Sequence, residues 1–473
     1  MTYLGKTFGF CFLSSAALTA ATLTLIGCGS PLPASRTDAL ESTGSEGDND
    51  LLRPFATGTG RIQTFSSTGE IDTENPFFQS LGTNGRSCSS CHQASDAWTI
   101  TPRHVQERFN ETDGLDPIFR KVDGSNSPNI DDSTVAARQR GYSMLLNKGL
   151  IRIGLPIPQG AEFELVSADD PYGYASSGEL SLFRRPLPST NLKFLATVMW
   201  DGRETFPRES IDFDLLHQSN SATRGHAQAI ADLTPQQRRD IVDFEMTIST
   251  AAIDDRSAGR LTDHGARGGP RFVEREPFYI GINDVLGADP TGRPFDPHVF
   301  TIFDAWSNPD GDSHRQARMA VARGQSLFNT RQIHIRGVKG LNDDLHIDDL
   351  VGACSTCHDT PNSGNHSVSL PIDIGVADES RRTPDLPLYT LRNRTTGELI
   401  RTTDPGRALI SRRWKDISKF KGPILRALAG RAPYFHNGSA QDFSAVLDFY
   451  DTRFEMHLTA GERSDLIAFL RAL

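Results

Sequence analysis

The chain contains one five-residue pattern twice, as Cys88-Ser89-Ser90-Cys91-His92 and as Cys354-Ser355-Thr356-Cys357-His358. Cys-x-x-Cys-His is the pattern at which c-type haem is attached to a protein. The two thiols add to the haem vinyl groups, and the histidine that follows is the proximal ligand of the iron. No other cysteine follows residue 28, which favours haem over a structural zinc site or paired disulfides. The sequence therefore predicts two covalently bound haem c groups.

The N-terminus has the order of an export signal. Lys6 is followed by an apolar run that ends in Leu-Ile-Gly-Cys at residues 25–28, and such a run after a basic start is typical of a secretory signal. The ending resembles the bacterial lipoprotein box, in which the cysteine is lipidated and becomes the first mature residue. We expect a signal peptide over residues 1–27 and lipidation of Cys28. The alternatives are an ordinary cleaved signal and a retained membrane helix, for which the run is short.

The composition of residues 28–61 predicts a flexible tether, because Ser, Thr, Gly and Asp dominate and apolar side chains are few. Haem c is attached outside the cytoplasm, so the haem motifs and the export signal indicate the same compartment. We expect the protein on the periplasmic side, lipid-anchored to a bacterial membrane, with the outer membrane as the expected one. The net charge of -10 disfavours nucleic acid as a partner.

An internal repeat predicts two haem domains. Residues 233–244 match residues 458–469, and each copy begins with a capping box, formed by Thr234 with Gln237 and by Thr459 with Glu462. Each copy continues as an amphipathic helix. Each also follows one haem motif and resembles the C-terminal helix of cytochrome c domains, which packs over the helix preceding the haem motif.

The fold class that follows is mainly α, with two cytochrome c-like haem domains, long loops and few short strands. We expect the N-terminal domain over residues 62–255 and the C-terminal domain over residues 300–473. Residues 256–299 are dense in Gly, Pro, Arg and Asp and indicate a linker or a long surface excursion. Further expected elements are a helix over 316–328, an inserted loop over 331–352, and candidate strands over 150–156 and 163–166.

Three further motifs make a family resemblance specific. They are Met-Trp-Asp-Gly-Arg-Glu at residues 199–204, Pro-Ile-Leu-Arg at 423–426 and Ala-Pro-Tyr-Phe-His-Asn-Gly-Ser at 432–439. With the two haem motifs in this order, the chain resembles the bacterial dihaem cytochrome c peroxidases and the related MauG-type enzymes. The resemblance runs from about residue 66 to the end, and is distant in the first domain and close from residue 404 onward.

The resemblance implies a division of labour between two haems. The N-terminal haem meets hydrogen peroxide, while the C-terminal haem stores or relays an electron from a small cytochrome c, a cupredoxin or another periplasmic donor. A tryptophan between the haems couples them, and Trp200 in Trp-Asp-Gly-Arg matches it. The alternative is a core aromatic, the commoner fate of a lone tryptophan.

The sixth ligand of the second haem separates the subfamilies. In the peroxidases it is a methionine fourteen residues after the histidine of Pro-Tyr-Phe-His, and in MauG it is a tyrosine there. The same count from His436 ends on Tyr450, on the apolar face of an expected helix. A thioether raises the haem potential, whereas a phenolate oxygen favours oxidised iron. The alternative is that Tyr450 packs in the core and Met456 is the ligand or the site stays open.

At the first haem, the peroxidases use a glutamine and a glutamate after Trp-Asp-Gly-Arg. Gln218 matches the glutamine if the loop is longer, but no glutamate follows at the expected place, and His226 is offered instead. A histidine titrates near neutrality and so suits proton transfer to and from peroxide. Arg224 is a candidate for stabilising the developing negative charge. His104 is either a cap on the first haem or a residue at the start of a helix.

Calcium is the least supported cofactor. Family members hold one calcium ion between the domains, partly through backbone carbonyls just before Pro-Tyr-Phe-His, and Arg431 and Pro433 occupy those positions. Carbonyl ligands do not depend on side-chain identity. The asparagine expected before Trp-Asp-Gly-Arg is not evident, and Arg185 falls near its position. The resemblance leaves one calcium ion open, without support from side chains.

The sequence as a whole predicts a dihaem c-type oxidoreductase that reduces hydrogen peroxide at the N-terminal haem, with the C-terminal haem relaying electrons. The haem carries the redox chemistry, and the protein supplies ligands, proton transfer and the electron route. Two alternatives stay open. One is a MauG-like oxidase or oxygenase that acts on an organic or protein substrate, which Tyr450 and the missing glutamate favour. The other is a non-enzymatic dihaem electron-transfer cytochrome.

Overall fold

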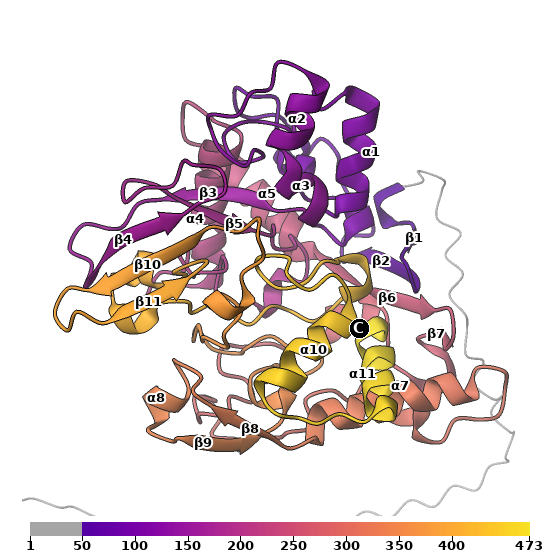
Figure 1. Ribbon diagram of the computed structural model, residues 1–473. Coiled ribbons are helices and arrows are strands. Elements are labelled where there is room, and N and C mark those ends of the chain that lie inside the picture. The colour runs from indigo at the N-terminus through magenta and orange to yellow at the C-terminus, as the bar shows by residue number, and fades with distance from the viewer. Residues whose placement is uncertain (1–49) are drawn as a thin grey trace, which may run out of the picture. The chain divides into compact units, whose positions relative to one another are not determined.

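A computed structural model describes residues 50–473 of the chain (Figure 1). Cys28, the signal peptide and the tether up to residue 49 lie outside these residues and stay predictions. The expected tether ends earlier than residue 61, because β1 (Phe55–Ala56) pairs with β2 (Gly60–Ser66). Three apolar side chains at the end of the segment, Leu51, Leu52 and Phe55, pack on the core around Trp98 and hold this part of the chain in place. The polar composition of residues 28–61 as a whole did not reveal them.

Eleven α-helices and eleven short strands alternate with 3-10 turns over residues 50–473. The helices are α1 (Pro102–Thr112), α2 (Val135–Gly141), α3 (Ser143–Lys148), α4 (Ile211–His226), α5 (Pro235–Thr247), α6 (Pro270–Arg275), α7 (Arg315–Thr330), α8 (Asn342–Leu345), α9 (Ala408–Ser411), α10 (Phe443–Arg453) and α11 (Ala460–Ala472). This content is compatible with the mainly α prediction. Strands are more numerous than the sequence indicated.

The remaining strands are β3 (Ile151–Leu155), β4 (Phe163–Asp169), β5 (Leu180–Arg184), β6 (Ile248–Asp255), β7 (Gly259–Arg260), β8 (Ile333–Arg336), β9 (Asp349–Gly352), β10 (Leu388–Asn393) and β11 (Leu399–Thr402). The strands predicted over 150–156 and 163–166 are confirmed as β3 and β4. The expected loop at 331–352 contains instead the antiparallel pair of β8 and β9, with α8 between them.

No sheet of the described residues has more than four strands. The largest has the order β1-β2-β6-β7, and the next has the order β11-β10-β4. In the second sheet β4 pairs antiparallel with β10 from Leu388 opposite Asp169 to Asn393 opposite Phe163. Figure 1 shows this pairing as the orange β10 and β11 beside the purple β4. A segment expected in the first domain therefore shares a sheet with a segment expected in the second.

The two repeated helices are confirmed as α5 and α11, each with both halves of its capping box formed. The second copy packs as the cytochrome c resemblance implies, with α11 against α7, the helix that precedes the second haem motif (Figure 1). The two helices approach closely at Gly324, where a Cβ atom would lie 1.9 Å from the carbonyl oxygen of Asp465. The helix predicted over 316–328 is thereby confirmed as α7.

The first copy is different. In place of a long preceding helix, α5 packs against a 3-10 turn, Pro76–Phe78, through Phe77 and Phe244, whose ring centroids are 4.9 Å apart. Among the described residues, no α-helix precedes the first haem motif. The first half therefore departs from a cytochrome c domain where the second half resembles one.

Residues 256–299 are packed rather than free. Helix α6 lies against β6, and the side chains of Val273, Ile282 and Val299 are buried. The segment is therefore an excursion that covers both halves, and the proposed division of the chain into domains stays a prediction. No helix of the described residues is long and apolar enough to cross a membrane.

The contact at Gly324 predicts a stability effect. Gly324→Ala is expected to lower the free energy of unfolding by about 3 kcal/mol, the upper end of the range for overpacking, because the new methyl group meets backbone rather than a side chain. Gly461→Ala in α11 is the matched control, since nothing lies within 4 Å of its added Cβ. It is expected to raise stability by up to about 1 kcal/mol. Equal midpoints for both variants in urea unfolding would contradict the close helix contact.

Candidate functional site

The two Cys-x-x-Cys-His motifs fold into the same local structure. Cys88–Ser90 and Cys354–Thr356 each form a 3-10 turn. In each turn the hydroxyl of the third residue accepts a hydrogen bond from the amide of the residue before the turn. The Ser90 hydroxyl accepts from the Ser87 amide at 3.0 Å, and the Thr356 hydroxyl accepts from the Ala353 amide at 2.9 Å. The histidine amide then donates to the first cysteine's carbonyl. All four cysteines are free thiols at cavity walls.

Both motif histidines are oriented by a hydrogen bond at Nδ1. His92 Nδ1 lies 2.9 Å from the Trp98 carbonyl oxygen, and His358 Nδ1 lies 2.5 Å from the Gly364 carbonyl oxygen. A proton on Nδ1 leaves Nε2 as the acceptor. Burial lowers the pKa of both histidines to about 4, so they are neutral at pH 7. A neutral imidazole with a fixed Nδ1–H is the form that ligates a metal.

The second motif lines a cavity of about 230 Å³, which we call cavity B. That volume is far above the ~10–15 Å³ that holds one buried water. The walls are mostly apolar. Cavity B is lined by the motif residues Cys354, Cys357 and His358 and by side chains that include Ile333, Ile335, Phe420, Leu447 and Phe454.

Both alternatives for the sixth ligand lie at cavity B. Tyr450 in α10 lines it, and so does Met456 just after that helix. The Tyr450 ring lies among aromatic neighbours, with Phe454 stacked at 6.1 Å and Phe435 tilted at 6.1 Å. Burial raises the pKa of Tyr450. The structure therefore brings Tyr450 to the cavity that its sequence position implied.

The first motif lines a cavity of about 170 Å³, which we call cavity A. Cys88, Cys91 and His92 form part of its wall, together with Gln218 and His226 from α4. The structure thus brings both residues predicted to handle peroxide to the first haem motif. It does not bring Arg224 there. Arg224 is half exposed and pairs with Asp232 at 2.8 Å, because the helix turns it away from the cavity wall.

His226 is held by a buried acid. Its Nδ1 lies 2.5 Å from Asp123 Oδ2, and Arg86 pairs with the other Asp123 oxygen. Burial acts to raise the pKa of Asp123, but the hydrogen bond from His226 and the charge of Arg86 outweigh it, so the pKa lies below its usual value. Asp123 is therefore an anion that fixes the imidazole of His226 with Nε2 left free to exchange a proton.

His104 lies at the start of a helix, which was the second of its two expected roles. It lies in the first turn of α1, and its Nδ1 is 2.5 Å from Asp96 Oδ1. It is not among the residues that line cavity A. The structure therefore gives no support to His104 as a cap on the first haem.

Trp200 lies in the wall between the two cavities and lines both. Its indole Nε1 donates to the Arg185 carbonyl at 2.8 Å, and its ring meets the His436 ring edge-on at 6.2 Å. Lys421 and Arg431 line both cavities as well. Trp200 therefore lies between the two haem motifs, and its coupling role stays a prediction.

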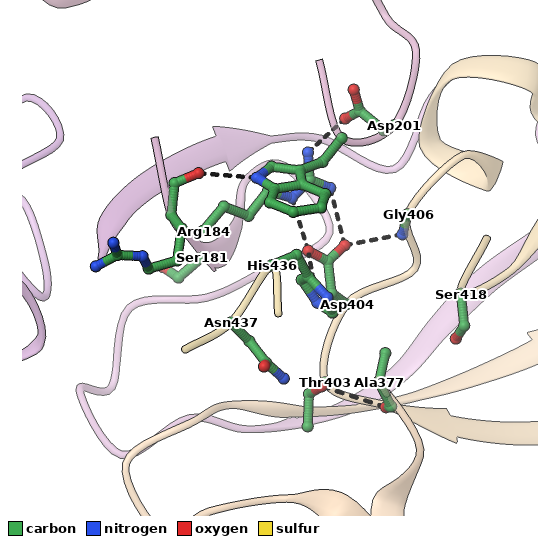
Figure 2. A network of polar contacts seen from close by, with 12 residues as sticks. Ser181, Arg184, Asp201, Ala377, Thr403, Asp404, Gly406, Ser418, His436 and Asn437 are labelled. Carbon is green, nitrogen blue, oxygen red and sulfur yellow. Dashed lines mark hydrogen bonds and ion pairs between the residues drawn. The ribbon is translucent and has the colours of Figure 1, made fainter. Parts of the chain in front are cut away.

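Asp201, which follows Trp200 in the Trp-Asp-Gly-Arg motif, anchors this wall through a buried arginine. Figure 2 shows Arg184 between two carboxylates, with Nη1 2.5 Å from Asp201 Oδ2, Nε 2.7 Å from Asp404 Oδ2 and Nη2 2.9 Å from Asp404 Oδ1. All three side chains are buried. Although burial opposes its charge, Asp201 has a pKa of about 2, because Arg184 and Arg203 stabilise the anion. His436 lies beside the same group, with Nε2 4.0 Å from Asp404 Oδ2.

The residues present fit haem. Two buried nitrogen atoms at the wall of cavity B have no hydrogen-bond partner among the described residues, namely Arg431 Nε and His436 Nε2. Such orphaned groups are costly in a finished fold. A haem carries two propionates that would accept from arginine. With free thiols, oriented histidines and large apolar cavities, the residues at each motif are compatible with c-type haem.

Sequence reasoning missed several buried charged residues here. Asp123 and Arg86 hold His226, Lys421 lies between the cavities, and Glu245 lines cavity A. Burial raises the pKa of Glu245 to about 7 and lowers the pKa of Lys421 to about 7. Glu245 also has one oxygen, Oε2, without a partner. Arg86 stands two residues before Cys88, which is a weak signal. The other three are ordinary charged residues in the sequence, and only the fold reveals their burial.

Calcium does not fit the place at which the resemblance would put it. The Arg185 guanidinium donates to three carbonyl oxygens, from Nη2 to Ile100 at 2.7 Å and to Arg431 at 3.0 Å, and from Nη1 to Lys148 at 2.9 Å. The Arg431 carbonyl was one expected calcium ligand. Burial lowers the pKa of Arg185 to about 10, so it is charged at neutral pH. A side-chain cation therefore takes the role of the ion.

No family model matches the chain. It is similar to curated cytochrome-c peroxidases. It is 31% identical over 132 residues to cytochrome-c peroxidase IdrP2 of Denitromonas iodatirespirans, a match that covers 26% of this chain and 36% of that protein. It is 27% identical over 191 residues to cytochrome-c peroxidase IdrP1 of Pseudomonas sp. (strain SCT), which covers 36% of this chain and 43% of that protein.

The chain thus spans less than half the length of these curated relatives. The similarity supports the cytochrome c peroxidase part of the resemblance and implies haem c as the cofactor. The MauG-type part, the number of haems and the roles of single residues stay predictions.

The arginine at the expected calcium position predicts indifference to calcium. Addition of calcium to protein dialysed against EGTA is expected to leave the thermal unfolding midpoint unchanged. Arg185→Ala is expected to lower it, because three buried carbonyl oxygens lose their donor and each costs about 1–3 kcal/mol. Arg267→Ala is the control, since this exposed arginine also donates to a carbonyl, that of Thr301. A midpoint that falls with EGTA and returns with added calcium would show that an ion binds after all.

Proposed function

We propose that this chain is a dihaem c-type oxidoreductase that reduces hydrogen peroxide to water at the haem of residues 88–92. Electrons reach that haem from the one at residues 354–358, with Trp200 in the route. One observation carries the proposal: cavity A holds a histidine fixed by a buried carboxylate. The similarity to cytochrome-c peroxidases supports the same reaction.

Reduction of one peroxide to two waters consumes two electrons and two protons. When bound, haem supplies the redox-active iron. The protein's part is to handle protons, and His226 is the residue for it: Nε2 takes a proton from peroxide and returns it to the leaving oxygen. Asp123 keeps the imidazole in one tautomer and stabilises its protonated form, and the Gln218 amide is placed to bind peroxide by hydrogen bonds.

The electron route follows from the shared wall. Trp200 lines both cavities, and Lys421 donates its backbone amide to the Trp200 carbonyl at 2.9 Å, which ties the indole segment to the second half. The donor that refills the haems is a small cytochrome c, a cupredoxin or another periplasmic protein. The export signal and Cys28 support a place on the periplasmic side, held to the membrane by lipid.

The role of His226 predicts a selective loss of activity. His226→Ala is expected to slow peroxide consumption, with a reduced cytochrome c as donor, by roughly a hundredfold, the lower end of the range for a positioned acid–base group. A pyridine haemochrome assay should still give two haems per chain.

His217→Ala is the matched control for this variant. His217 lies in the same helix and pairs with Glu204 at 2.5 Å, but it does not line cavity A. It is expected to keep the wild-type rate. Equal rates for both variants would remove His226 from the mechanism. A wild-type protein with two haems that consumes no peroxide would favour the electron-transfer cytochrome instead.

A second candidate, a MauG-like oxidase, is favoured by Tyr450 at cavity B. Tyr450→Phe is expected to change the spin state of one haem, because it removes an oxygen ligand, and Tyr450→Met is expected to raise that haem's potential. Met456→Leu is the paired variant and should leave both properties unchanged. Redox titration with EPR measures them. If Met456→Leu changes the spin state or potential of a haem and Tyr450→Phe does not, methionine is the ligand and the hypothesis of a MauG-like oxidase loses its support.

A further inference from the structure

Three buried side chains meet beside the second haem motif without using all of their polar atoms. Asp359 directly follows His358, His366 is seven residues further on, and Asp284 comes from the excursion at residues 256–299. Their exposed fractions are 0%, 8% and 1%. One ligand atom from each lies within 4.8 Å of the other two.

The backbone holds one oxygen of each carboxylate and leaves the other free. Asp359 Oδ1 accepts from the Ser367 amide at 2.6 Å, and Asp284 Oδ2 accepts from the Ala288 amide at 2.8 Å. Asp359 Oδ2, Asp284 Oδ1 and His366 Nδ1 have no hydrogen-bond partner. A carboxylate oriented by one oxygen, with the second directed at a shared point, is typical of metal ligands supported by outer contacts.

The spacing also fits an ion. His366 Nδ1 lies 2.9 Å from Asp359 Oδ2, yet the two do not have the geometry of a hydrogen bond. Ligand atoms bound tetrahedrally at about 2.0–2.2 Å to one ion lie roughly 3.3–3.6 Å apart, so side-chain shifts of well under 1 Å would bring this pair to the spacing of ligands. Among the described residues, no lysine or arginine pairs with Asp284 or Asp359, so two buried carboxylates lack a counter-charge that a divalent cation would supply.

We propose that Asp284, Asp359 and His366 bind a divalent transition-metal ion, with Zn²⁺ as the preferred one. The imidazole nitrogen favours zinc and its neighbours over calcium and magnesium, which prefer oxygen ligands alone. Two carboxylates and one neutral imidazole make the charge of the bound site zero. The buried hydroxyls of Thr360 and Ser367 also have no partner and are available to a water on the ion.

The ion's role would be structural. It joins the excursion at residues 256–299 to the loop of residues 358–367. That loop contains His358 and also Gly364, whose carbonyl orients the His358 imidazole. Two contacts already tie the same segments, from Asn283 Nδ2 to the Asp359 carbonyl at 3.1 Å and from the Gly281 amide to the Ser367 carbonyl at 2.9 Å. The site is separate from the peroxide chemistry and does not rest on it.

Elemental analysis of the purified haem-loaded protein tests the site. We expect one zinc per chain beside the haem iron. Asp284→Asn keeps the shape of the side chain and is expected to reduce zinc to below about a tenth of an equivalent. Asp296→Asn is the matched control, because Asp296 also pairs with a histidine, His298, at 3.1 Å, but the pair is exposed. It should keep the wild-type zinc content.

A second measurement applies if Asp284→Asn does not fold. Wild-type protein is stripped with a chelator and titrated with Zn²⁺, and its thermal unfolding midpoint is expected to rise by several degrees and to level off at one equivalent. Haem iron as the sole metal, together with a midpoint that Zn²⁺ does not move, would overturn the proposal. Another divalent metal present in the wild type and lost in Asp284→Asn would support the site and overturn the choice of zinc.

Discussion

The buried ion pair network of Arg184 holds the two halves of the molecule in one arrangement. Arg184 ends β5 in the first half, and its carboxylate partners are Asp201 in the same half and Asp404 in the second. Removal of one partner from such a buried network costs about 3–5 kcal/mol, because a charge stays behind unpaired. The network therefore tolerates little relative movement, and it fixes the Trp-Asp-Gly-Arg motif against the segment around Asp404.

The shared wall between the cavities is a consequence of this arrangement. Trp200 precedes Asp201 directly, so the ion pair that fixes Asp201 also fixes the indole between the two haem motifs. The Arg185 guanidinium, next to Arg184, binds three carbonyl oxygens from both halves. Consecutive arginines thus link the two halves by charge and hydrogen bonds and give the wall that contains Trp200 a fixed geometry.

The sequence predicted those features that depend on short spacings. The haem motifs, the capping boxes of α5 and α11, and the position of Tyr450 all follow from residues within one or two turns of each other. It did not predict the pairing of β4 with β10, the close contact of Asp123 with His226, or the site around Asp284. Each joins segments that are distant along the chain, and Asp123 and Asp284 look like ordinary surface acids until burial is known. The prediction for Arg224 was wrong because the helix directs its side chain to Asp232 and away from cavity A.

The two haem motifs share one local turn, so the two sites differ in what surrounds the turns rather than in the turns themselves. The wall of cavity A includes the fixed histidine, Gln218 and the buried Glu245. The imidazole and the carboxyl group are of the kinds that can exchange protons. Cavity B surrounds its motif with residues such as Ile335, Leu447 and Phe454, which exclude water. Burial and low polarity are among the factors by which a protein tunes a haem potential. This difference between the walls around a repeated turn is the physical ground on which we propose different roles for the two sites.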